Sequence, residues 1–442
     1  MFAMRSHANL GIAAVALALA ACGDSQGPPI DAATDSLIQA VRQLAQEKQV
    51  TPLDPAPRVR PALVKLGQAL AFDKIMSGNH DVSCMTCHLP QFGTSDARSL
   101  SVGVGGTGLG PERDGAVIGR NAPAAFNLTA LGPLFFDGRV EQVGGAYHTP
   151  AGAQLTPAMT AVFEFGTLSA QPLFPLLSRA EMRGEGGSNE LADFADDDNT
   201  GTWNAIMARL GAIPEYREMF EDAYPGVSFD DMNIAYASNA IGGFLAADFG
   251  SNGSPWDKFL AGDNRALTLT ELKGAENFLK AKCSTCHNGP AFTDNKFHNV
   301  AVAQVGPGNG NGTDDFGRMN VTSNPADKYA FRTPPLRNVE LTAPYGHDGA
   351  YVTLRMFVDH YSESDTKLRN FDASSLDPDL QGTLQANAED ILATRDTLLN
   401  GVVFTDEQVD QVTAFMKALT DPAARNLGHT VPASVPSGLG VD

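Results

Sequence analysis

Apolar residues recur at intervals of three and four positions in several separated segments of this 442-residue chain. Spacing of this kind places apolar side chains on one face of a helix. The segments are 35–50, 61–73, 203–224, which Pro214 divides into two, and 230–249. The pattern therefore predicts amphipathic helices that pack their apolar faces into a core.

Two further helices are marked by the residues at which they begin. The segments 268–271 (TLTE) and 405–408 (TDEQ) have the form of a capping box, and each precedes an apolar run at helical spacing. Gly- and Pro-rich loops separate the helical segments, and runs that alternate between apolar and polar residues are scarce. We therefore expect an all-α fold with long loops.

Composition and charge narrow the class of protein. Hydrophobic residues make up 43% and charged residues 19% of the chain, which is typical of a globular protein. The formal net charge of −20 argues against nucleic acid as a partner. An acidic surface can steer a basic electron-carrier protein, although it can also serve solubility alone.

Two CxxCH pentapeptides carry the most specific chemistry in the sequence. They consist of Cys84, Cys87 and His88, and of Cys283, Cys286 and His287. In this motif the two thiols form thioethers with one porphyrin and the histidine becomes the proximal ligand of its iron. A single copy could be chance or half of a zinc site. Two copies that use four of the five cysteines predict two covalently bound haem c groups.

The fifth cysteine, Cys22, follows an apolar N-terminal segment. Residues 1–21 contain Arg5 and then an apolar run, which is the pattern of a secretory signal. The stretch Leu19-Ala20-Ala21-Cys22-Gly23 resembles the lipobox of bacterial lipoproteins, which implies acylation of Cys22. An ordinary signal peptide is the alternative. We expect a location on the periplasmic side, with membrane attachment by the lipid anchor only.

The ligand on the far side of each iron decides what a haem does. Two strong protein ligands make an electron-transfer centre, whereas an open side permits catalysis. The candidates are His148 and Met159 after the first motif, and His298, Met319, His347, Met356, His360 and Tyr361 after the second. Composition and spacing leave these alternatives open.

From about Leu63 to Thr420 the chain resembles the bacterial di-haem cytochrome c peroxidases and the related MauG enzymes. The motifs that carry the resemblance are RNAP at 120–123, FFDGR at 135–139, Gln171 with Pro175 and Glu181-Met182, FRTPPLRNV at 331–339 and LTAPYGHDG at 341–349. The resemblance implies two cytochrome c-like haem domains. The first haem would react with hydrogen peroxide, and the second would relay electrons.

The resemblance also implies roles for three residues near the first haem. Glu181 would carry a proton from the near to the far oxygen of peroxide so that water can leave. Gln171 would position peroxide or water, and Pro175 would belong to the same distal pocket. The structural alternative is that Glu181 closes a capping box with Ser178.

The distal ligand of the second haem separates two groups within the family. The matching helix ends at Tyr361, where peroxidases of the family carry Met and MauG has Tyr. A phenolate would favour high oxidation states of the iron. Met356 and His360 are the rival ligands, and a buried, hydrogen-bonded phenol or a packing methionine is the structural alternative.

Two departures from the family pattern concern reactivity. Val104 stands where many members carry a histidine that blocks the first iron until reduction, so we expect an open site without activation. Phe136 stands where the family has a tryptophan between the haems, which puts a hopping relay there in doubt. An insertion between Arg139 and Gly166 could cover the haem edge or simply be tolerated.

A calcium ion is a further feature that the resemblance implies. Asn121 would supply a side-chain oxygen, and Thr342 and Pro344 would supply carbonyl oxygens. A plain contact between loops is the alternative.

These expectations combine into a domain plan. Residues 1–21 form the signal, 22–54 a lipidated tether and helix, 55–230 the peroxidatic haem domain, 231–420 the electron-transfer haem domain and 421–442 a tail.

Three functions fit this plan. The first is a peroxidase that reduces hydrogen peroxide with electrons from a small cytochrome c or cupredoxin. The second is a MauG-like enzyme that oxidises side chains of a protein substrate, and the third is a non-enzymatic electron-transfer cytochrome.

Overall fold

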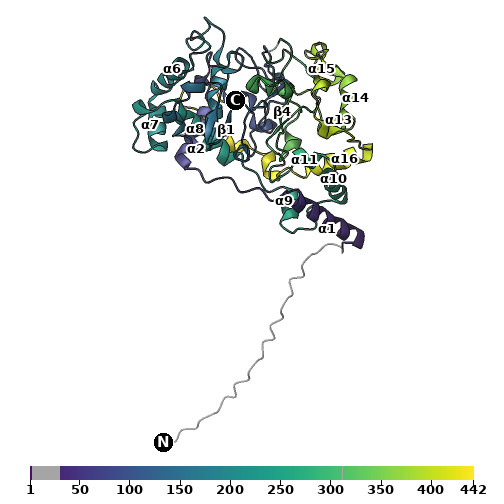
Figure 1. The fold of residues 1–442 in the computed structure, drawn as a ribbon. Helices are drawn as coiled ribbons and strands as arrows, with labels where there is room; N and C mark the ends of the chain where they lie inside the picture. Colours follow the sequence, from purple (N-terminus) through teal and green to yellow (C-terminus); the bar gives the residue numbers. More distant parts are fainter. Residues whose placement is uncertain (2–29, 311) are drawn as a thin grey trace.

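The chain forms a helix-rich fold with few strands (Figure 1). The computed structural model describes Met1 and residues 30–310 and 312–442, so the predicted signal and the predicted lipidation at Cys22 lie outside the described residues. Within those ranges, no helix is long and apolar enough to cross a membrane. The expected fold class is confirmed in its main feature, because helices dominate and each strand has only two or three residues.

The first half of the chain contains the helices that lead into and surround the first CxxCH motif. Its helices and strands are α1 (Ala32–Glu47), α2 (Pro61–Phe72), α3 (Cys84–Cys87), β1 (Glu141–Val143), β2 (Ala146–His148), α4 (Pro157–Thr160), α5 (Thr167–Ala170), α6 (Asn199–Gly211), α7 (Pro214–Ala223) and α8 (Ile234–Asp248).

The second half repeats the order of helix, CxxCH segment, long loops and closing helix. Its elements are α9 (Pro255–Leu260), α10 (Leu269–Lys280), α11 (Cys283–Cys286), β3 (Phe297–His298), α12 (Met319–Thr322), β4 (Phe331–Arg332), α13 (Leu354–His360), α14 (Ser364–Arg369), α15 (Ala388–Ala393) and α16 (Asp406–Lys417). Antiparallel pairing joins β1 to β2 and β3 to β4.

The sequence predicted the seven longest of these helices, α1, α2, α6, α7, α8, α10 and α16, to within a few residues. α1 begins three residues earlier than expected, because the Asp31 carboxylate accepts the backbone N–H of Thr34 and caps the helix. α8 begins later than expected, at Ile234, where Asn233 is the cap. Both predicted capping boxes, at the starts of α10 and α16, are confirmed by reciprocal hydrogen bonds.

The first hydrophobic cluster surrounds the packing of α2 against α8. α8 is buried along most of its length, and α5, α6 and α7 pack around the pair. A Cβ atom at Gly67 would lie 1.9 Å from the carbonyl oxygen of Ala240, so any side chain there would push the two helices apart. The first CxxCH segment follows α2 and rests on this cluster.

The second hydrophobic cluster is built in the same way around α10 and α16, with α1 and α13 against them. A Cβ atom at Gly274 would lie 1.9 Å from the carbonyl oxygen of Gln411. The rings of Trp256 and Phe278 pack against Phe415 with centroids 5.1 and 5.3 Å apart. Each CxxCH segment therefore follows a helix whose position a glycine contact fixes.

The C-terminal residues return to the first cluster. Leu427 and Val435 are buried in it, and the Ser437 hydroxyl donates to the Asp73 carboxylate over 2.6 Å. The Asp442 carboxylate lies 2.5 Å from the Lys74 ammonium and also accepts from the hydroxyl of Thr86, inside the first CxxCH motif. The segment 421–442 thus packs on the surroundings of the first motif, and the domain boundaries stay a prediction.

A buried ion-pair group joins the two halves of the chain. The Arg120 guanidinium lies 2.7 Å from Asp137 and 2.6 Å from Asp315, and all three side chains are at most 10% exposed. Burial alone would lower the pKa of Arg120, but the two carboxylates raise it, so the guanidinium stays charged. Removing either carboxylate would leave a buried positive charge only partly compensated.

The segment between Arg139 and Gly166 forms a hairpin (β1 and β2) and a short helix (α4), and contacts of aromatic and charged side chains hold it in place. The Tyr147 ring meets the Phe163 ring edge to face at 5.4 Å. Glu164 pairs with Arg60 at 2.6 Å.

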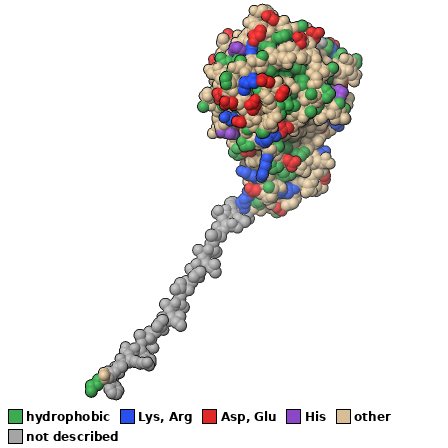
Figure 2. All heavy atoms as spheres, turned by 90° about the vertical axis from the view of Figure 1, so that its left-hand side faces the viewer, with side chains coloured by type: hydrophobic (Ala, Val, Ile, Leu, Met, Phe, Trp, Pro, Cys, Tyr) green, Lys and Arg blue, Asp and Glu red, His purple; other side chains and the backbone are tan. Residues whose placement is uncertain are grey.

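Acidic side chains gather on the face that carries α6 and α7 (Figure 2). The exposed acidic residues of this region are Glu185, Glu190, Asp193, Asp196, Asp197, Glu215, Glu218, Glu221, Asp222, Asp230 and Asp231. We call this set the acidic face.

Candidate haem-binding cavity

The histidine of each CxxCH motif is oriented by a backbone carbonyl. His88 Nδ1 lies 3.1 Å from the Thr94 oxygen, and His287 Nδ1 lies 3.0 Å from the Phe292 oxygen. A carbonyl oxygen can only accept, so Nδ1 carries the proton in both rings and Nε2 is left as the metal-binding atom. Burial lowers the pKa of both rings, which keeps them neutral and able to bind a metal.

One continuous cavity receives the side chains of both motifs. The residues that the CxxCH motifs and the family resemblance implicate, and that the structure describes, all line it, namely Cys84, Cys87, His88, Asn121, Gln171, Pro175, Glu181, Cys283, Cys286, His287, Thr342, Pro344 and Tyr361. These residues come from positions up to 277 apart in the sequence, from Cys84 to Tyr361. The structure therefore brings these candidates together, while their individual roles stay predictions. Of the other candidate iron ligands, His298 and His347 line it, whereas His148, Met159, Met319, Met356 and His360 are not among its lining residues.

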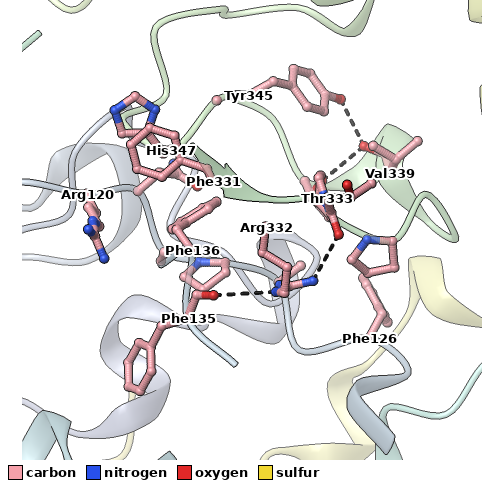
Figure 3. Close-up of a pocket in the computed structure, with 18 of the residues that line it drawn as sticks. Arg120, Phe126, Phe135, Phe136, Phe331, Arg332, Thr333, Val339, Tyr345 and His347 are labelled. Atoms are coloured by element: carbon pink, nitrogen blue, oxygen red, sulfur yellow. Dashed lines mark hydrogen bonds between the residues drawn. The ribbon is translucent and has the colours of Figure 1, made fainter. Parts of the chain in front are cut away.

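Buried polar groups that lack either an acidic partner or any hydrogen-bond partner in the described chain test whether haem fits this cavity. The Arg332 guanidinium is buried and donates to the carbonyl oxygens of Phe135 and Thr333, at 3.4 and 3.1 Å, rather than to a carboxylate of the described chain (Figure 3). Burial lowers its pKa to about 10. Two more lining atoms, His347 Nδ1 and Arg337 Nη2, have no hydrogen-bond partner among the described residues. Buried donors of this kind suit the acidic propionates of haem, so the cavity fits the group that the motifs imply.

Aromatic rings occupy the middle of the cavity. Phe331 stacks on the His347 ring at 3.8 Å and 14°, beside Arg120 and Phe136 (Figure 3). The carbonyl oxygen of Phe136 accepts the backbone N–H of Arg332 over 2.7 Å, which fixes the segment that carries Phe136 against β4. Phe136 lines the cavity.

Glu181 lies in a π-helical turn, Arg179–Arg183, and its side chain lines the cavity. Such turns are rare and frequently occur at functional sites. The Ser178 hydroxyl accepts the backbone N–H of Glu181 over 3.3 Å, which is one half of the predicted capping box. Since the carboxylate of Glu181 faces the cavity together with Gln171 and Pro175, capping accounts for the turn but leaves the carboxylate available.

Burial and nearby cations act on Glu181 in opposite directions. Burial raises the pKa of Glu181, while the positive charges of Arg139 and Arg120 oppose the rise. Arg139 lies 3.5 Å over the Phe135 ring and 3.2 Å from the Asp137 carboxylate. A carboxyl group in this position can exchange a proton nearer to neutral pH than an exposed one.

The loop that contains Val104 lies directly on the Glu181 turn. The backbone N–H of Val104 points at the carbonyl oxygens of Ala180 and Glu181, at 3.2 and 3.0 Å. A Cβ atom at Gly103 would lie 1.8 Å from the Ala180 oxygen, so the loop can approach this closely only with glycine there. Val104 is partly buried against the first hydrophobic cluster.

The three rival ligands of the second iron occupy different surroundings. Tyr361 lines the cavity, and its pKa is raised by burial and by the thiols of Cys283 and Cys286. Met356 packs against the second hydrophobic cluster instead. His360 Nε2 lies 2.8 Å from the Val300 oxygen and Nδ1 lies 2.9 Å from the Tyr351 hydroxyl. Of the three, Tyr361 is the one that reaches the cavity without losing other bonds, and its ligation stays a prediction.

The three predicted calcium ligands all line the cavity. The Asn121 amide nitrogen donates to the carbonyl oxygens of Arg98 and Ser99, at 2.9 and 3.2 Å. This orients the Asn121 side chain and leaves its oxygen for a cation. Thr342 and Pro344 line the same cavity.

For many of the lining residues, among them Arg139, Arg332 and Met416, the sequence predicted no role. Arg139 and Arg332 belong to motifs that were recognised, FFDGR and FRTPPLRNV, but only the structure shows them facing the cavity. Met416 is a lining residue of α16 whose helical spacing is that of an ordinary core residue. For Arg139 and Arg332, the available signal was an arginine within a recognised motif, whereas Met416 carried no such signal.

Comparisons with known proteins agree with this geometry. A family model described as di-haem cytochrome c peroxidase matches residues 61–265. The cytochrome c551 peroxidase of Pseudomonas aeruginosa is 31% identical over 290 residues, which cover 64% of this chain and 67% of the relative. The methylamine utilization protein MauG of Methylorubrum extorquens is 29% identical over 354 residues, covering 80% and 83%. A solved MauG-like protein associated with microbial copper homeostasis is similar in fold, with a TM-score of 0.58, 26% identity and coverage of 85% and 94%.

Proposed function

Because this chain belongs to the di-haem cytochrome c peroxidase family and is therefore an oxidoreductase, we propose that it reduces hydrogen peroxide in the cavity beside His88. Electrons would reach that site through a second haem at His287 from an external donor. The overall change is H₂O₂ + 2 H⁺ + 2 e⁻ → 2 H₂O.

Haem bound at the two motifs would supply the iron that takes up peroxide and the redox equivalents for its reduction. His88 and His287 would hold the irons through Nε2. Glu181 would accept a proton from the near oxygen of peroxide and return it to the far oxygen, so that the O–O bond breaks with water as the leaving group. Gln171 would orient peroxide, while Arg332 and His347 would face the propionates.

One observation carries this proposal: Glu181 and His88 line the same cavity from different segments of the chain, and Val104 rather than a histidine lies on the Glu181 turn. A carboxyl group suited to acid–base work and a histidine suited to metal binding thus share one cavity, which supports the proposal. No side chain able to bind iron is present at position 104.

The direct test is the substitution Glu181→Gln, which keeps the shape of the side chain and removes its acid–base function. We expect the rate constant for the reaction of the ferric protein with peroxide to fall by about 10²- to 10⁴-fold. Glu185→Gln is the matched control, because Glu185 is exposed just beyond the same turn. Equal rates in all three proteins would remove the role of Glu181. No peroxide consumption by the wild type would favour the non-enzymatic electron-transfer cytochrome.

A MauG-like oxidation of protein side chains is the second candidate. The position of Tyr361 favours it, because a phenol lines the cavity beside Cys283 and Cys286 whereas Met356 does not. A phenolate ligand would stabilise an oxidised second iron. The measurement that separates the two candidates is the lifetime of the two-electron oxidised protein. Seconds to minutes without a donor would support side-chain oxidation, and immediate decay would support the simple peroxidase.

The surface and the N-terminal sequence suggest the setting of the reaction. The acidic face could attract a basic small cytochrome c or cupredoxin as donor. Calcium held by Asn121, Thr342 and Pro344 would brace the loop that contains Asn121 against the loop that contains Thr342 and Pro344. Location on the periplasmic side with a lipid anchor at Cys22 belongs to the same proposal.

A further inference from the structure

A buried tyrosine, Tyr351, lies one aromatic ring behind the cavity. Tyr351 is 4% exposed and pairs through its backbone with Tyr345. The ring of Phe357 lies between Tyr351 and Tyr361, with centroids 4.8 Å from the first and 5.4 Å from the second. Phe357 and Tyr361 line the cavity, so Tyr351 is in reach of electron transfer from it while remaining outside it.

The Tyr351 hydroxyl has a partner that can accept its proton. It lies 2.9 Å from His360 Nδ1. The other ring nitrogen, Nε2, lies 2.8 Å from the Val300 carbonyl oxygen, which can only accept, so Nε2 carries the proton of the neutral ring. Nδ1 is then the acceptor, and the Tyr351 hydroxyl is the donor.

Tyr345 differs from Tyr351 at this one point. Its ring also stacks near Phe357, at 6.3 Å, and it lines the cavity. Its hydroxyl, however, donates to the carbonyl oxygen of Val339 over 2.9 Å, and a carbonyl does not take up a proton (Figure 3). A phenol that loses an electron becomes a far stronger acid than imidazolium, so its oxidation is coupled to proton transfer where a hydrogen-bonded base is already in place, as His360 is for Tyr351.

We propose that Tyr351 is a redox site, which gives one electron to the oxidised haem pair while its phenolic proton moves to His360. The inference rests on the proposed function, because hydrogen peroxide supplies the oxidant. Tyr351 would hold one oxidising equivalent outside the haem cavity until a donor returns the electron.

The step balances in atoms and electrons. Peroxide takes two electrons from the haem pair and, with two protons, becomes two waters. One of those electrons is replaced from Tyr351, whose O–H bond breaks as an N–H bond forms at His360 Nδ1. The products are a neutral phenoxyl radical on Tyr351 and an imidazolium on His360, which still donates from Nε2 to Val300. An electron from the external donor reverses the step.

The experiment mixes the ferric holoprotein with hydrogen peroxide, freezes it at intervals and records the EPR spectrum together with the haem absorption. We expect a tyrosyl signal that narrows when the protein contains ring-deuterated tyrosine, with a coupling to one exchangeable proton that disappears in D₂O. Tyr351→Phe should abolish the signal and leave the initial reaction of the haems with peroxide unchanged. Tyr345→Phe is the matched control and should keep the signal.

The possible results separate this inference from the proposed function. Haems that are oxidised by peroxide without a tyrosyl signal, or with the same signal in Tyr351→Phe, would overturn the redox role of Tyr351 and leave peroxide reduction in place. Haems that do not respond to peroxide at all would overturn both, because the oxidant for Tyr351 would be missing.

Discussion

The backbone N–H of Val104 points at the carbonyl oxygen of Glu181 over a distance of 3.0 Å. This contact holds the Gly103–Val104 loop on the π-helical turn whose carboxylate faces the cavity. The backbone at position 104 therefore lies against the turn that carries Glu181, while the Val104 side chain packs against the first hydrophobic cluster. We propose that an iron-binding side chain at this position would close the reaction site.

Val104→His tests this relationship. The imidazole is longer than the valine side chain and offers a nitrogen ligand, so we expect it to bind the first iron and to make it low-spin in the resting ferric protein. The reaction with peroxide should then slow by about 10-fold or more until the protein is partly reduced. The absorption spectrum and the rate of peroxide consumption measure both effects.

Val104→Leu is the control for Val104→His, because it changes the volume without adding a ligand. It should keep the high-spin spectrum and the rate of the wild type. A Val104→His protein with the spectrum of the wild type would mean that the loop does not present position 104 to the iron.

The pH dependence should report the environment of Glu181. Burial raises its pKa, and the proposed role requires the carboxylate, which accepts the first proton. The rate of the peroxide reaction should thus fall as the pH drops through a value above the ordinary glutamate pKa of about 4.3. Stopped-flow rates between acid and neutral pH give this profile, and Glu181→Gln should lack the limb.

Arg139 should set where that limb lies. Its positive charge opposes the rise in the pKa of Glu181, so Arg139→Gln should move the acid limb to higher pH, and Arg139→Lys should restore much of it. A limb at the same pH in all variants would show that another group titrates. The KM for peroxide is the second readout. A merely structural effect of the substitution would change the KM without shifting the pH at which the rate falls.

Stability should depend on the buried charges that join the two halves. Asp315→Asn removes one of the two carboxylates beside Arg120, and we expect the free energy of unfolding to fall by about 3 kcal/mol. Asp410→Asn breaks the exposed pair with Arg355 and should cost less than about 1 kcal/mol. Denaturant unfolding of both holoproteins measures the difference, and equal losses would contradict the structural role of Arg120.

The sequence predicted those parts of the fold that depend on neighbouring residues. Helical spacing and capping boxes located α10 and α16, because a cap is formed by residues three positions apart. The sequence did not predict that Gly67 and Gly274 allow α2 and α8, and α10 and α16, to approach closely. Each of these contacts lies between segments that are far apart in the chain.

The candidate site shows the same division. The two CxxCH motifs were found from local spacing and Glu181 from the resemblance to a known family, whereas Arg332 and Tyr351 acquire their significance from hydrogen-bond partners that only the structure shows. Arg332 matters because it is buried without a carboxylate in the described chain, and Tyr351 because His360 accepts its hydrogen bond. Burial and long-range pairing of this kind leave no periodic pattern in a single sequence.

An open first haem site should react with peroxide without prior reduction of the protein. The decisive measurement is the absorption and EPR spectrum of the resting ferric holoprotein before and after one equivalent of hydrogen peroxide. We expect one high-spin and one low-spin haem at rest, and an immediate two-electron oxidation after mixing. Two low-spin, six-coordinate haems that ignore peroxide until the protein is half-reduced would contradict this expectation.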